Sequence, residues 1–116
     1  MDFCSDFRFD LELGQVAEKQ LADILSNEKI EVKRDMKASE TGNIFIEYES
    51  RGKPSGIATT EARFYCIALN DLFIIIPTET LKDLVRPYLF TTRDVNGGDN
   101  NSSKGVIFPI NKIIEL

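Results

Sequence analysis

The sequence predicts an α/β fold in which helices flank a mixed β-sheet, with the elements in the order α-β-β-α-β-α. Three observations support this class. Apolar residues recur at helical spacing in some segments and alternate with polar residues in others. A hydrophobic fraction of 42%, including 8 Phe and 3 Tyr, is enough to build a core. A length of 116 residues suits one compact unit, so we expect residues 1–116 to form a single domain.

The first half of the chain predicts a helix followed by two strands. Apolar side chains recur at helical spacing over residues 12–26. Residues 29–36 and 43–50 then alternate charged and apolar side chains, as half-buried strands do. The turn between them, residues 39–42, ends in Gly42. Two such strands joined by a turn that contains glycine indicate a hairpin.

The second half predicts alternating elements around one long polar loop. Residues 58–69 have apolar side chains at helical spacing, whereas residues 71–77 are apolar on both faces, as in a central strand. A short helix over 80–86 is stopped by Pro87. Short strands are expected on either side of a polar loop at 96–105. A mixed sheet covered by helices is the natural packing for this order.

Composition excludes several classes of function. The net charge of −5 argues against binding nucleic acid through a broad positive field. The absence of histidine removes His-based triads and most zinc sites. Two cysteines are too few for a disulfide framework. The N-terminus has no secretory signal pattern, and the longest apolar run, residues 72–77, is too short to cross a bilayer. We therefore expect a cytoplasmic protein with no membrane partner.

Acidic residues gather in the first half, which holds 12 of the 19. Alternation places Glu31, Lys33 and Asp35 on one face of the first predicted strand, and Glu47 and Glu49 on one face of the second. If these faces coincide, Asp35, Glu47 and Glu49 lie together and repel one another unless a divalent cation binds. Such oxygen ligands suit Mg²⁺ or Mn²⁺. The alternative, that the charges form the solvated face of a hairpin, remains open.

These features resemble the PD-(D/E)XK nuclease superfamily, which has the restriction-endonuclease-like fold. Archaeal Holliday junction resolvases and small phage nucleases belong to it. The resemblance covers residues 12–76 and depends on Gly14-x-x-x-Glu18 in a helix, Asp35 at the end of a strand, and Glu47-Tyr48-Glu49 in the next strand. It implies that Asp35, Glu47 and the backbone carbonyl of Tyr48 bind a metal ion, and that Glu18 completes the site.

The sequence departs from the motif at the position of its lysine, where this chain has Glu49. The lysine normally orients or activates the attacking water, and a minority of related restriction enzymes carry Glu-x-Glu instead. Lys33, on the same strand face as Asp35, and Lys53, in the following loop, are candidate replacements. If neither points inward, Glu49 has to act as the general base or as a second metal ligand.

The resemblance implies a metal-dependent DNA endonuclease acting on double-stranded or branched DNA such as a Holliday junction. A junction has two strands to cut, so this substrate implies a homodimer. The residues expected to contact DNA are basic or hydroxyl side chains in loops and at the start of the helix predicted over 58–69, namely Arg51, Lys53, Thr60, Arg63 and Lys104. Two other interpretations remain: a non-catalytic nucleic-acid or protein-binding module with this fold, and an acidic protein that mimics DNA charge.

Overall fold

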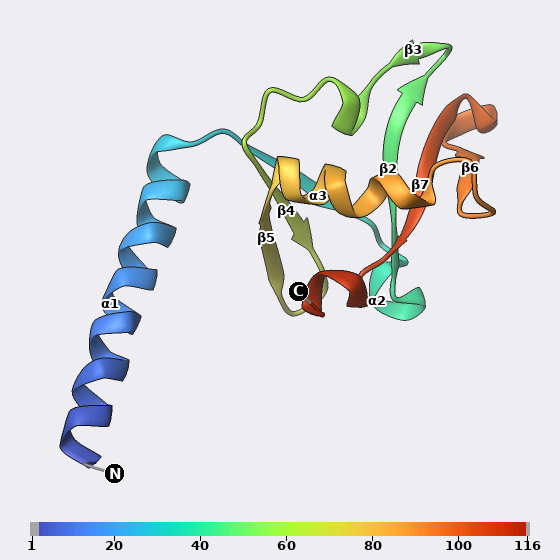
Figure 1. The fold of residues 1–116 in the computed structure, drawn as a ribbon. Coiled ribbons are helices and arrows are strands. Elements are labelled where there is room, and N and C mark those ends of the chain that lie inside the picture. Colours follow the sequence, from blue (N-terminus) through green and yellow to red (C-terminus); the bar gives the residue numbers. More distant parts are fainter. Residues whose placement is uncertain (1–2, 116) are drawn as a thin grey trace.

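The computed structural model describes residues 3–115, with side chains from residue 15 onward. A long helix, α1 (Phe3–Asn27), extends away from a body that contains all the strands (Figure 1). The prediction for 12–26 gave the end of this helix and placed its start too late. The sequence of residues 3–11 contains neither Gly nor Pro, so nothing in it stops the helix from extending toward the N-terminus.

The strands form two sheets. The first has the order β1-β4-β5, in which β1 pairs parallel with β4 and β4 pairs antiparallel with β5. Its strands are β1 (Ile30–Arg34), β4 (Phe64–Ala68) and β5 (Phe73–Pro77). The second has the order β3-β2-β7-β6 with antiparallel pairing throughout. Its strands are β2 (Asn43–Ser50), β3 (Lys53–Pro54), β6 (Asp94–Gly97) and β7 (Ser103–Pro109).

Short helices connect these strands. The α-helices after α1 are α2 (Ala38–Thr41), α3 (Thr78–Val85) and α4 (Asn111–Ile114). Three 3₁₀ turns follow strands or helices: η1 (Gly56–Ala58), η2 (Arg86–Tyr88) and η3 (Asp99–Asn101). The predicted α/β class with a mixed sheet is therefore confirmed. None of the helices in residues 3–115 is both long enough and apolar enough to span a membrane.

The core lies between β2, β7 and α3. Ile44 and Ile46 on β2 stand opposite Phe108 and Val106 on β7, and all four side chains are fully buried. Helix α3 crosses the body in front of the strands (Figure 1) and adds the buried Leu81 to the same cluster. The alternation predicted for residues 43–50 therefore holds as far as Glu47, and it directs Ile44 and Ile46 of β2 into the core.

The predicted helix over 58–69 is wrong, because residues 64–68 form strand β4. This strand lies between β1 and β5, and four of its five residues are buried. A segment that is apolar on all sides satisfies helical spacing and strand spacing equally, so periodicity cannot identify it. The aromatic and β-branched side chains of Phe64, Tyr65 and Ile67 favour a strand.

The predicted hairpin of residues 29–36 and 43–50 is also wrong. Strand β1 pairs with β4 in one sheet, and β2 pairs with β3 and β7 in the other. The connection between β1 and β2 contains α2, which ends at Gly42 with a φ of 72°. A helical turn in the connection redirects the chain, so the two strands enter separate sheets instead of pairing.

We predict that Phe108→Ala lowers the free energy of unfolding by about 3–5 kcal/mol, because it leaves a cavity among fully buried neighbours. Phe73→Ala is the matched control, since Phe73 on β5 is 72% exposed and its truncation should change stability by less than about 1 kcal/mol. Urea denaturation of both variants measures the difference. Equal losses in the two variants would contradict the placement of the core.

Candidate functional site

A small cavity of about 130 Å³ lies where β1, β2 and β4 approach one another, beside η1. Its lining combines two carboxylates, one amine and one phenol with apolar side chains: Glu31, Lys33, Phe45, Ile46, Glu47, Gly56 and Tyr65. Glu31 and Lys33 share one face of β1 because they are two residues apart in a strand. Tyr65 comes from β4, where it is the register partner of Glu31. The pairing of β1 with β4 therefore builds this group.

Glu47 is held in place by the segment that follows β3. Its Oε2 accepts a hydrogen bond of 2.9 Å from the Ser55 hydroxyl, and the side chain is partly buried. The next residue, Gly56, has a φ of 54°, and a Cβ at this position would overlap the carbonyl oxygen of Glu47. The close approach thus requires glycine, and it fixes the turn against Glu47.

The surroundings of the Tyr65 hydroxyl favour its protonated form. Burial, followed by the negative charges of Glu31 and Glu47, raises the pKa of Tyr65 from its usual 10.0 to about 12. Both carboxylates therefore act on the same phenol, which agrees with their common cavity. At neutral pH Tyr65 is available there as a hydrogen-bond donor.

The two candidate replacements for the motif lysine lie in different places. Lys33 lines the cavity together with Glu47. Lys53 is on the short strand β3, is exposed, and is not among the lining residues. Of the two lysines, Lys33 is therefore the one that the structure brings to Glu47.

Asp35 follows β1 directly, and its carboxylate binds backbone amides. Oδ1 accepts a hydrogen bond of 3.0 Å from the Lys37 amide, and Oδ2 accepts one of 3.4 Å from the Phe45 amide. These contacts join the turn before α2 to strand β2. The carbonyl of Tyr48, which the resemblance implied as a ligand, accepts a 3.0 Å hydrogen bond from the Ser55 amide. Both groups thus have structural partners within the chain.

Glu49 is separated from Glu47 by an irregularity in β2. Glu47 pairs with Gly105 on β7, whereas Glu49 pairs with the adjacent Lys104, so the register shifts at Tyr48. One extra residue in a strand redirects the side chains that follow it. The Glu49 carboxylate lies 3.6 Å from the Lys104 ammonium and lines a different pocket from Glu47.

The expected gathering of carboxylates is therefore not observed. Glu18 lies on α1 and is exposed. Among the side chains of residues 15–115, no three His, Cys, Asp or Glu come close enough to hold a metal ion together. The physical reason is that β1 and β2 do not form a hairpin, and that the register shift in β2 separates Glu47 from Glu49.

The residues expected to contact DNA do not form one surface element. Arg51 and Lys53 are exposed at the turn between β2 and β3. Arg63 forms a 2.9 Å ion pair with Glu28, and the Thr60 hydroxyl accepts a hydrogen bond from the Ala62 amide. The helix N-terminus expected to hold a phosphate near Thr60 does not exist, because this segment leads into strand β4.

The site predicted from the sequence lacks three polar residues at or beside the cavity: Glu31 and Tyr65, which line it, and Ser55, which binds Glu47. Glu31 could have been included from the sequence, because alternation places it on the same strand face as Lys33. Tyr65 could not be placed while its segment was interpreted as a helix. Ser55 lies in a loop, where spacing gives no direction to a side chain.

Comparison of the chain with protein-family models finds no match. Searches of curated proteins and of solved structures find no significant match either.

We predict that Gly56→Ala is more destabilising than Gly52→Ala. Both glycines have positive φ, so each substitution should cost about 1–2 kcal/mol of backbone strain. At Gly52 an added Cβ meets nothing within 4 Å, whereas at Gly56 it overlaps backbone. The overlap should add about 1–3 kcal/mol, measured by urea denaturation. Equal losses would contradict the close approach to Glu47.

We predict that Tyr65→Phe removes a phenol that ionises at about pH 12. Because the pKa of Tyr65 is higher in the folded chain than its usual 10.0, the unfolded chain loses this proton first, and stability falls as pH rises from about 10 to 12. The variant should show a shallower loss of stability in this range and a smaller ultraviolet phenolate signal near pH 12. An unchanged signal near pH 12 would contradict the assignment.

Proposed function

We propose that the chain is a metal-dependent deoxyribonuclease that hydrolyses phosphodiester bonds at the cavity of Glu31, Lys33 and Glu47. The observation that carries this proposal is that Lys33 lines the same cavity as Glu47. A lysine beside a strand carboxylate is the combination that the PD-(D/E)XK motif requires, supplied here from β1 in place of β2. The restriction-endonuclease-like fold is part of the same proposal.

The donor set of this cavity fits Mg²⁺ or Mn²⁺. Mg²⁺ keeps several waters and is commonly held by one or two protein carboxylates together with phosphate oxygens of the substrate. Glu31 and Glu47 are the two carboxylates that line the cavity. When bound, the ion would lower the pKa of a coordinated water and neutralise charge on the phosphate.

The protein groups have separate tasks in this proposal. The Lys33 ammonium attracts the phosphate and stabilises negative charge that develops on its oxygens. Ser55 orients the Glu47 carboxylate by its 2.9 Å hydrogen bond. Tyr65, which stays protonated, donates to an oxygen in the cavity. Asp35 acts as a positioning residue, because its carboxylate joins the end of β1 to β2.

The proposed substrate is double-stranded or branched DNA. Arg51 and Lys53 are exposed within a few residues of Ser55 and Gly56, so they can contact phosphates next to the cavity. Cleavage of both strands of a junction requires two such cavities, which is why we propose a homodimer for that substrate.

A second candidate is a nucleic-acid or protein-binding module without catalysis. It is favoured by the separation of the acids, since the described side chains include no group of three metal-ligating residues. Metal-dependent cleavage distinguishes the two candidates, because only the first requires a metal ion and a chemical product.

We predict cleavage of a labelled four-way junction or duplex in the presence of Mg²⁺ or Mn²⁺. Glu47→Gln and Lys33→Met should each reduce the rate by about a hundredfold or more, because each removes a charge from the cavity. Glu49→Gln and Lys112→Met are the matched controls, since Glu49 lines another pocket and Lys112 lies on α4. Their rates should stay within about threefold of wild type.

Two outcomes would overturn this assignment. Failure of the wild-type chain to cleave any duplex, flap or junction with either metal would favour the binding module. A loss of activity in Glu49→Gln equal to that in Glu47→Gln would place the chemistry in the neighbouring pocket instead.

A further inference from the structure

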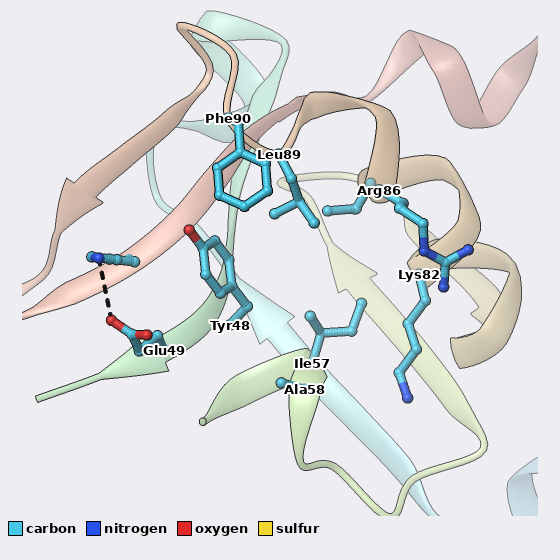
Figure 2. Close-up of a pocket in the computed structure, with 10 residues that line it drawn as sticks. Tyr48, Glu49, Ile57, Ala58, Lys82, Arg86, Leu89 and Phe90 are labelled. Atoms are coloured by element: carbon cyan, nitrogen blue, oxygen red, sulfur yellow. Dashed lines mark ion pairs between the residues drawn. The ribbon is translucent and has the colours of Figure 1, made fainter. Parts of the chain in front are cut away.

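A second and larger pocket, of about 460 Å³, lies between β2, η1 and the segment from α3 to Phe90 (Figure 2). Its size is in the range of small-molecule sites in proteins. Apolar side chains such as Ile57 and Leu89 line it, and the remaining groups are two aromatic rings, three cations and one acid. These groups are Tyr48, Phe90, Lys82, Arg86, Lys104 and Glu49.

Phe90 is the unusual residue of this pocket. Its side chain is 96% exposed, and its φ of 63° places a bulky residue in the left-handed region. An exposed aromatic ring on a strained backbone gains nothing from burial, and such strain is typically found at functional sites. The ring therefore requires an explanation other than the stability of the free chain.

One carboxylate holds both aromatic residues of the pocket. Asp94 Oδ2 accepts a 2.9 Å hydrogen bond from the Phe90 amide, and Oδ1 accepts a 2.6 Å hydrogen bond from the Tyr48 hydroxyl. Asp94 thus fixes the Tyr48 side chain and the backbone of Phe90 before any ligand arrives.

The cations of the pocket are held in ion pairs that an anionic ligand can replace. Lys82, Arg86 and Lys104 line the pocket, and the Lys104 ammonium lies 3.6 Å from the lining acid Glu49. Lys82 and Arg86 also form ion pairs with Glu79 and Asp83, and both of these carboxylates are exposed on α3. Exposed ion pairs of this kind contribute little free energy, so a ligand phosphate can compete for the same cations.

We propose that this pocket binds a nucleoside phosphate, with the base stacked on Phe90 and the phosphate held by Lys82 and Arg86. A planar base can stack on the exposed aromatic ring, and a phosphate can replace the exposed carboxylates that pair with Lys82 and Arg86, so a nucleoside phosphate supplies both groups. The ligand is either a free nucleotide or one nucleotide of a single strand. This site is separate from the cavity of Glu47, and it does not depend on the proposed hydrolysis.

Calorimetric titration with adenosine 5′-monophosphate and with a 5′-phosphorylated deoxyadenosine tetranucleotide tests the proposal in metal-free buffer. Phe90→Ala should weaken binding by about tenfold or more, as the loss of base stacking does in other proteins. Phe90→Gly should weaken it equally while removing the backbone strain at this position, so misfolding cannot account for the loss. Phe73→Ala, which truncates the exposed ring on β5, is the matched control and should bind as wild type does.

The charged partners give a second, independent measure. Lys82→Gln should reduce the affinity by about threefold or more, whereas Lys112→Gln should leave it unchanged. Adenosine and inorganic phosphate, tested singly, should bind more weakly than the nucleotide. Binding of the mononucleotide assigns the pocket to a free nucleotide, and binding of the tetranucleotide alone assigns it to a strand.

The proposal is overturned if neither nucleotide ligand binds, or if Phe90→Ala binds either one as tightly as wild type. It is also overturned if affinity is lost in Lys33→Met and retained in Phe90→Ala, because binding would then occur at the cavity of Glu47. Loss of cleavage with retained nucleotide binding, in contrast, concerns the proposed nuclease activity alone.

Discussion

The pairing of β2 with β7 is the constraint on which the rest of this structure depends. It places Ile44 and Ile46 against Phe108 and Val106, and these four side chains form the fully buried centre of the core. Alternation along β2 then directs Glu47 away from that centre and into the small cavity. A single strand thus supplies both the apolar contacts that stabilise the fold and the carboxylate on which the proposed chemistry depends.

The register shift at Tyr48 brings β2 to a second pocket. Without it, Glu47 and Glu49 would point to the same side of the sheet, as strict alternation requires. With it, Glu49 pairs with Lys104 and lines the larger pocket, next to the Tyr48 ring. Bulges often lie beside functional sites because they change the direction of one side chain. Here one bulge directs Glu47 and Glu49, which are two residues apart, into two different pockets.

The sequence was sufficient for elements with a clear two-residue or helical period and insufficient for those without one. Strand β2 and helix α3 were predicted close to their observed bounds, because each has one apolar face. Strand β4 was not, since it is buried on both faces and periodicity gives no preference. The same limit applies to the residues of the candidate site. Lys33 and Glu47 could be named from alternation, whereas the position of Tyr65 depends on the pairing of β1 with β4.

The contacts of the acidic side chains change how the negative charge of the chain is interpreted. If Asp35, Glu47 and Glu49 shared one site, their mutual repulsion would demand a cation to hold them. Instead, Asp35 accepts hydrogen bonds from two backbone amides, and Glu49 forms an ion pair with Lys104. Each of these two negative charges is therefore stabilised by a partner within the chain. A metal ion at the cavity of Glu47 is therefore not needed for the fold to form. It would be recruited by two carboxylates and a substrate phosphate together, which predicts that metal affinity rises when the nucleic acid is bound.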